Sequence, residues 1–215
     1  YKSYNKTLKN INAILASKNQ NQLDEWLSQL SFLSVEISQA RINYIQKLIK
    51  ILEESSLQKL ESFIESTKNL KFKLQTGWTK DVDGLNQKEI ITYLQNNKDS
   101  FIRTKHLGYG PHRATVDFYL NNKNEGFLSR GEQKKLSIVF WMLQVLVLAN
   151  EKSDPVVLID DISSELDQKK INSILDFLTN LNIQIFITDI GNKELPLDLK
   201  KTNIYHIKKG IIVSA

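Results

Sequence analysis

The sequence predicts an α/β protein that begins with a helical arm, and three observations lead to this prediction. Apolar residues recur every three or four positions from Leu23 to Leu52, which is the spacing of a long amphipathic helix. Residues 156–159 and 183–188 are short apolar runs, which suit strands buried on both faces of a parallel sheet. Residues 168–181 between them have helical spacing, so this region is predicted to form a strand-helix-strand unit.

The N-terminal region is predicted to be entirely helical. No Gly or Pro occurs before Gly77, and breaks are expected near residues 19–21 and 55–56. Two or three helices would therefore fold back on one another as an arm or hairpin, with a plain bundle as the alternative. We assign residues 1–68 to this arm and residues 69–215 to a second domain.

The pattern changes after the arm. Leu70, Phe72 and Leu74 alternate with polar residues, which predicts a strand before a turn at Gly77 and Trp78. Further elements follow in order: a helix over residues 87–96, a strand over 115–120, a turn over 121–124, a helix over 130–149, and a terminal hairpin formed by 204–207 and 211–213.

The composition excludes cysteine-based chemistry and a membrane-spanning segment. The chain has no cysteine, which excludes disulfides, thiolate metal sites and a cysteine nucleophile. No apolar run approaches the roughly 18 residues of a membrane span, and no signal peptide is present, so we expect a cytoplasmic protein without a membrane partner. The sequence starts at Tyr1 in place of Met, and we therefore expect a fragment of a longer protein.

The positive charge of the chain is modest. The net charge is +5, and residues 1–80 carry the whole excess, with 12 Lys and Arg against 7 Asp and Glu. This bias is compatible with contacts to a nucleic-acid backbone, but it is far from a dedicated polybasic surface.

Residues 128–133, Leu-Ser-Arg-Gly-Glu-Gln, lie between a predicted turn and a long predicted helix. The free amides at such a helix start can bind a phosphate. Ser129 followed three positions later by Glu132 also matches a capping box, in which the two residues satisfy the helix start by themselves. Both interpretations remain open from the segment alone.

The same region excludes a phosphate-binding loop. Gly126 and Gly131 have the spacing of the two glycines in G-x-x-x-x-G-K-[ST], but Glu132 stands where the loop needs Lys. Gln133 replaces the Ser or Thr that binds magnesium, and the other glycines do not form the motif either. The chain is therefore predicted to be unable to cradle a nucleotide with such a loop of its own.

A pair of carboxylates follows the first apolar strand. Asp160 and Asp161 would lie at the C-terminal edge of a parallel sheet, where α/β proteins place ligands, and hard oxygens there suit Mg²⁺. The alternative is structural: neighbours at a strand end point to opposite faces, so one acid could be solvated or paired.

Residues 163–167 come next, and by themselves predict only a loop with a helix cap. The order of the motifs is more specific than any one of them. A Leu-Ser-x-Gly segment, a helix, a strand ending in two acids and then Ser-Glu-Leu-Asp at 164–167 resemble the signature, Walker B strand and D-loop of an ABC-type ATPase head.

Finer details resemble the RecF family. They are Leu-Ser-Arg-Gly-x-Gln-Lys at 128–134, the Asp-Asp pair, Ser-Glu-Leu-Asp, and Tyr-Gly-Pro-His-Arg at 109–113. The resemblance implies the C-terminal part of an ABC-type head, with a mainly parallel sheet and helices, behind a helical lobe. The N-terminal sheet with the phosphate loop would be missing.

The resemblance also implies roles for individual residues. The signature would close in trans on ATP held by another subunit, through Ser129, Arg130, Gly131, Glu132 and Gln133. Asp160 would help to hold Mg²⁺, and Asp161 would orient or activate the attacking water. Ser164 and Asp167 of the D-loop would adjoin the nucleotide and report across the dimer interface.

Three segments depart from the ABC pattern or lie outside it. Asp161 stands where most ABC ATPases carry Glu, so slow hydrolysis is expected, since a shorter carboxylate must reach through water or a shifted backbone. Thr188-Asp189 stands where many carry a switch His, which leaves the γ-phosphate sensor unassigned. His112 and Arg113 are candidate DNA or nucleotide contacts, with a structural hydrogen-bonding unit as the alternative.

The function implied is that of a DNA-binding ATPase in DNA replication, recombinational repair and the SOS response. It would dimerise with ATP and Mg²⁺ at single-strand gaps or single/double-strand junctions, and help to load the recombinase through RecR- and RecO-type mediators. This chain alone would be inactive. The alternatives are an SMC-like or other ABC head, and a non-enzymatic helical module that binds DNA or protein.

Overall fold

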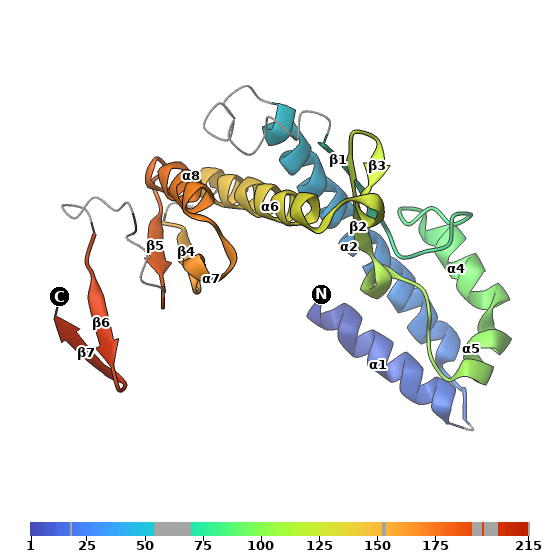
Figure 1. Ribbon diagram of the computed structural model, residues 1–215. Helices are drawn as coiled ribbons and strands as arrows, with labels where there is room; N and C mark the ends of the chain where they lie inside the picture. The colour runs from blue at the N-terminus through green and yellow to red at the C-terminus, as the bar shows by residue number, and fades with distance from the viewer. Residues whose placement is uncertain (18, 54–69, 152–153, 191–194, 196–201, 215) are drawn as a thin grey trace. The chain divides into compact units, whose positions relative to one another are not determined.

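The computed structural model describes the chain except residues 18, 54–69, 152–153, 191–194, 196–201 and 215 (Figure 1). The described residues up to Phe140 form one compact unit and those from Trp141 onward form a second. The division falls within helix α6 (Arg130–Glu151). The expected domain boundary after residue 68 lies outside the described residues and stays a prediction.

Four helices build the main core of the first unit: α1 (Lys2–Ala16), α2 (Leu23–Glu53), α4 (Gln87–Asn96) and α5 (Lys98–Thr104). The predicted long helix and the break before it are confirmed, whereas the break expected at 55–56 lies outside the described residues. Of the described helices, none is long and apolar enough to cross a membrane. The buried core residues are Tyr4, Ile11, Leu15, Leu23, Leu27, Leu30, Ile90, Leu94, Phe101 and Leu107.

The first unit also contains a small antiparallel sheet, in the order β1 (Leu70–Gln75), β2 (Thr115–Leu120) and β3 (Lys123–Asn124). Phe72 and Phe118 are cross-strand partners, and both rings pack edge-on against Phe140 of α6. The predicted strands over 70–74 and 115–120 are confirmed. The turn expected at 121–124 is wrong in its second half, because residues 123 and 124 pair with β2.

The second unit contains the predicted strand-helix-strand arrangement. Strand β4 (Val156–Ile159) pairs in parallel with β5 (Gln184–Ile187), and α8 (Gln168–Thr179) connects them. The predicted terminal hairpin is also confirmed, as β6 (Tyr205–Lys208) pairs with β7 (Ile211–Ser214). The parallel arrangement applies to β4 and β5, whereas the other described sheets are antiparallel.

The two faces of the β4–β5 sheet differ. On one face, Ile159 and Ile187 pack against a core formed by Ile162, Ile171 and Leu175. On the other face, Val156, Leu158 and Phe186 are 46%, 73% and 53% exposed. Parallel sheets normally bury both faces, so the second face has the composition of an interior surface, but the described residues leave it uncovered.

Candidate functional site

The signature segment forms the turn that leads into α6. The short 3₁₀ helix η3 (Glu125–Phe127) precedes it, and the Glu125 carboxylate accepts a hydrogen bond from the Phe118 amide of β2 at 2.7 Å. From the other side, Gln133 Nε2 donates to the Glu125 carbonyl at 2.9 Å. Contacts on both sides of Ser129 therefore fix the start of α6 relative to the sheet.

Ser129 and Glu132 form the predicted capping box. The Ser129 amide and hydroxyl both donate to Glu132 Oε2, at 2.8 and 2.7 Å, and the Glu132 amide donates to Ser129 Oγ at 3.3 Å. The hydrogen bonds from Ser129 are the main reason why the pKa of Glu132 is lowered, and Lys123 and Lys135 contribute to the same shift. An ionised carboxylate thus caps the helix where an external anion would bind.

Neither a close contact nor the backbone conformation in the described structure requires glycine at position 131. A Cβ atom placed on it would meet nothing within 4 Å, and its backbone is not among the positive-φ glycines. A helical glycine costs about 0.5–1 kcal/mol relative to alanine. The space over the first turn of α6 is therefore open to a group from outside, which could approach helix amides that have no intrahelical acceptor.

Thr188 holds the acidic end of β4. Its amide donates to the Ile159 carbonyl at 2.9 Å, which extends the parallel pairing by one residue. Its hydroxyl donates to Asp160 Oδ1 at 2.5 Å and accepts a hydrogen bond from the Asp161 amide at 2.9 Å. One threonine on the neighbouring strand therefore sets the positions of both acids. Beside it, the Ser163 hydroxyl donates to the Asp189 carboxylate.

The two acids have different environments. Asp160 is exposed, whereas Asp161 is half-buried and adopts a left-handed backbone with φ 46° and ψ 60°. The Oδ1 atom of Asp161 is buried and lacks a hydrogen-bond partner among the described residues. Such an atom calls for a cation, a water or a donor from elsewhere. The described residues hold no cluster of three or more His, Cys, Asp or Glu that could enclose a metal.

The segment after these acids is more ordered than expected. Residues 162–165 form a short helix, α7 (Ile162–Glu165), where the sequence predicted a loop. Ser164 Oγ donates to the Asp161 carbonyl at 2.9 Å, which holds this turn against the acidic pair. Asp167 caps α8 as predicted, because its Oδ1 atom accepts a hydrogen bond from the Lys170 amide at 2.9 Å.

The Tyr-Gly-Pro-His-Arg segment at 109–113 is hydrogen-bonded to α1. Tyr4 OH lies 2.8 Å from His112 Nδ1, and His112 Nε2 lies 3.2 Å from the Leu107 carbonyl. Because a carbonyl only accepts, Nε2 carries the proton and Nδ1 accepts from Tyr4. Burial lowers the pKa of His112, which favours this neutral form. His112 is thus a structural hydrogen-bonding unit, while Arg113 beside it is exposed.

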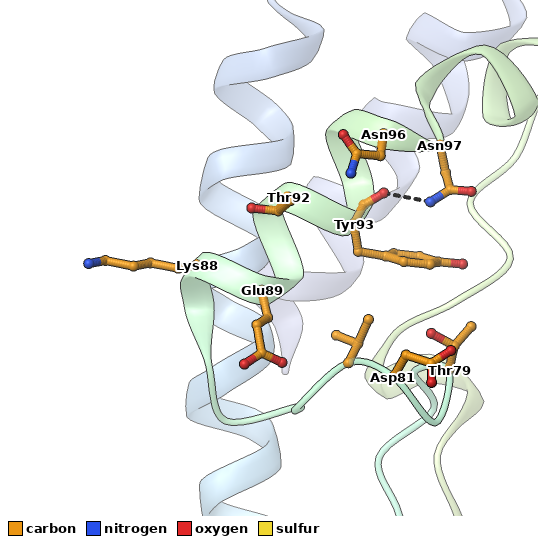
Figure 2. A pocket seen from close by; sticks show the side chains of 9 residues that line it. Thr79, Asp81, Lys88, Glu89, Thr92, Tyr93, Asn96 and Asn97 are labelled. Carbon is orange, nitrogen blue, oxygen red and sulfur yellow. Dashed lines mark hydrogen bonds between the residues drawn. The ribbon is translucent and has the colours of Figure 1, made fainter.

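An open groove of about 600 Å³ lies along α4 (Figure 2). Its wall includes the Tyr93 ring, and the Asn97 amide group donates to the Tyr93 carbonyl at 2.8 Å. The Glu89 carboxylate accepts from the Asp83 amide and from the Asn86 side chain, so it supports the neighbouring loop. None of the residues singled out in the sequence lines this groove.

Comparisons with known proteins give a consistent family. No family model matches the chain. It is 33% identical over 212 residues to the DNA replication and repair protein RecF of Psychromonas ingrahamii, a match that covers 95% of this chain and 55% of that protein. It is 30% identical over 220 residues to RecF of Streptococcus equi subsp. equi, covering 97% and 57%.

This chain is related to RecF. It spans about half the length of the curated relatives it matches. The fold agrees with this relationship, since the structure described as recombination mediator protein RecF-ATP in the RecFOR pathway matches with a TM-score of 0.72 and 21% identity. That match covers 99% of this chain and 56% of the other. The expected α/β fold, of RecF type with a helical region, is confirmed.

In this RecF relative, the signature residues lie in the first unit and the acidic pair and D-loop in the second. Within the second unit, Ser164 bonds to the Asp161 carbonyl, and Thr188 bonds to both Asp160 and Asp161, so these groups lie close together. The hydroxyl of Thr188 was not assigned from the sequence. Parallel register was the available signal, because Thr188 follows Ile187, the partner of Ile159.

Proposed function

We propose that this chain supplies the signature, Walker B and D-loop parts of a RecF-type, DNA-binding ATPase. In this proposal ATP is sandwiched between two copies, with the signature of one closing on nucleotide bound by the other. The assembled protein acts at single-strand gaps or single/double-strand junctions and aids recombinase loading with RecR- and RecO-type mediators. The relatives named RecF and a fold match described as RecF-ATP support this assignment.

The observation that carries the proposal is the open first turn of α6 at Gly131. The turn is fixed to the sheet, yet it leaves space where its glycine lacks any internal role. A γ-phosphate approaching from another subunit would use this space and the helix-start amides. The Glu132 carboxylate now holds the Ser129 hydroxyl and amide, so binding requires Glu132 to release Ser129.

Asp160 and Asp161 fit a magnesium site that has few protein ligands. Mg²⁺ usually keeps several waters and binds one or two carboxylates together with substrate phosphates, so a larger cluster of acids is unnecessary. Asp160 would hold the ion, which neutralises charge on the phosphates. The Oδ1 atom of Asp161, which is buried and has no hydrogen-bond partner among the described residues, would orient the attacking water and activate it as a base. Thr188 would keep both carboxylates in position.

The phosphate loop must come from outside this sequence. The apolar face of β4–β5 that the described residues leave exposed supports the same view, because Leu158 and Phe186 suit contact with another layer of structure. We propose that the segment carrying the loop covers this face. ATP hydrolysis should then be absent from this chain alone and appear on mixing with a separately produced N-terminal half from the same gene.

Two variants test the proposal on the mixed protein. Ser129→Arg should abolish ATP-dependent dimerisation measured by light scattering, because it fills the signature turn with a bulky cation. Ser137→Arg, an exposed position two turns later in α6, is the matched control and should dimerise normally. Equal dimerisation with and without ATP, unaffected by Ser129→Arg, would contradict the sandwich. ATP hydrolysis by this chain alone would contradict the proposal that the phosphate loop comes from outside this sequence.

A further inference from the structure

Two stretches of the sequence carry the net positive charge of the chain. Residues 1–23 contain four Lys, residues 100–116 contain three Lys or Arg, and neither stretch contains Asp or Glu. The other 175 residues carry 22 basic and 24 acidic residues. The charge is therefore concentrated far more sharply than the overall value of +5 suggests.

The fold brings these two stretches side by side within the first unit. Helix α1 packs against α5, as Figure 1 also shows. The Leu107 amide donates to Asn12 Oδ1 at 2.9 Å, and Tyr4 OH lies 2.8 Å from His112 Nδ1. Two acid-free segments about a hundred residues apart thus lie together in the fold.

Helix α1 presents a row of lysines away from the core. Lys2, Lys6 and Lys9 are exposed and stand at positions i, i+4 and i+7, while Tyr4 and Ile11 are buried. Like charges at this spacing repel and cost a few tenths of a kcal/mol per pair. Among the described residues, no carboxylate forms an ion pair with any of the three. The row is therefore uncompensated within the described structure.

The second stretch carries further exposed positive charge. Lys105 and Arg113 are exposed, and Arg113 follows His112, which is bonded to α1. We call Lys2, Lys6 and Lys9 on α1 the basic face. Two aromatic side chains belong to the same stretches, Tyr1 at 62% and Tyr109 at 42% exposed.

We propose that the basic face binds the sugar-phosphate backbone of DNA. This inference deepens the proposed function, on which it rests, by naming its DNA-contacting surface. From Lys2 to Lys9 the helix rises about 10 Å, at 1.5 Å per residue, which spans about three phosphates of one strand. Tyr109 of the second stretch, which is 42% exposed, suits stacking on an unpaired base, a contact that an acidic protein would not use.

The test measures the affinity of the full chain for a gapped DNA duplex by fluorescence anisotropy between about 50 and 200 mM salt. The variant carries Lys2→Gln, Lys6→Gln and Lys9→Gln. The matched control carries Lys80→Gln, Lys88→Gln and Lys169→Gln, exposed positions outside the basic face with the same loss of charge. A third form with Lys2→Arg, Lys6→Arg and Lys9→Arg retains the charge.

The basic-face variant should bind at least about tenfold more weakly, and its slope of log affinity against log salt should be shallower by about 2 to 3, one per lost phosphate contact. The control and the arginine form should keep the full slope. Equal slopes for variant and control would overturn the basic face while leaving DNA as a partner of the proposed function. Absence of DNA binding by the unsubstituted chain would also overturn the basic face, whereas absence of DNA binding by the mixed protein would overturn DNA as a partner in the proposed function.

Competition separates DNA from an acidic protein as the partner. Polyglutamate at matched charge should displace the DNA poorly, because it offers no bases for stacking. If polyglutamate competed as well as unlabelled DNA, the assignment to nucleic acid would be wrong. ATP-dependent dimerisation of the mixed protein should be unchanged in the basic-face variant, since these lysines belong to none of the nucleotide motifs.

Discussion

The signature turn and the acidic end of β4 both combine carboxylates with a hydroxyl side chain, but the hydrogen bonding of the carboxylates differs between them. At the signature turn, the Glu132 carboxylate receives two hydrogen bonds from Ser129, so the local structure is satisfied without any ligand. At the acidic end, Thr188 orders both aspartates but leaves Asp161 Oδ1 buried and without a partner among the described residues.

The signature turn is therefore held by hydrogen bonds within the fold, whereas one carboxylate oxygen of the acidic pair has no partner among the described residues. Replacing a capping residue should weaken the fold, because the fold uses it. Replacing an unpartnered acid should leave the fold intact and affect only the chemistry. The following changes test that contrast.

The largest effect is expected from Asp161→Asn. The amide keeps the size of the side chain and tolerates the left-handed backbone, but it cannot act as a base. ATP hydrolysis by the mixed protein should fall by about 10²–10⁴-fold. The melting temperature of the chain should stay the same or rise. A large loss of stability would mean that the Asp161 carboxylate has a structural partner after all.

Thr188→Val should disturb the same site through its scaffold. Valine keeps the branched shape but removes the hydroxyl that bonds Asp160 and the Asp161 amide. Loss of both bonds should destabilise the second unit by about 1–3 kcal/mol, measured by urea unfolding. Thr188→Ser, which keeps the hydroxyl, is the control and should retain most of the stability. Equal free energies of unfolding for the two variants would show that the Thr188 hydroxyl does not organise the acidic pair.

Ser129→Ala should weaken the signature turn by about 1 kcal/mol, the usual contribution of a helix cap. The effect should depend on pH. Because the folded-state pKa of Glu132 is lowered, its stabilising contribution is present above its unfolded value near 4.5 and is lost as pH falls through the folded value. Melting curves from about pH 7 to pH 3 should show this loss, and Glu132→Gln should remove that part of the pH dependence. An unchanged profile in Glu132→Gln would show that the capping box does not form in solution.

Gly131→Ala should have the smallest effect on stability and the opposite sign. Alanine favours a helix, and its Cβ would meet no atom within 4 Å, so α6 should gain roughly 0.5 kcal/mol. ATP-dependent dimerisation should nevertheless weaken, because the methyl group fills the space proposed for the γ-phosphate. A variant that is more stable and dimerises normally would remove Gly131 from the proposed interface.

The elements predicted best are those whose side-chain pattern is long or strongly apolar. The period of three to four residues predicted α2, and the apolar runs predicted β4 and β5 within a residue or two. The sequence did not predict α5, β3 or α7. These pieces span seven, two and four residues, too short for a period to show. Their formation depends on neighbours, such as the Ser164 bond to the Asp161 carbonyl.

The sequence by itself determined the order of the motifs, the capping box at Ser129 and Glu132, and the absence of a phosphate-loop motif, because these are local facts of spacing and residue type. Only the tertiary structure decided which groups meet across the chain. Parallel pairing brought the Thr188 hydroxyl to Asp160 and Asp161, and helix packing brought two acid-free stretches together. Such contacts join residues far apart in sequence, and no local pattern encodes them.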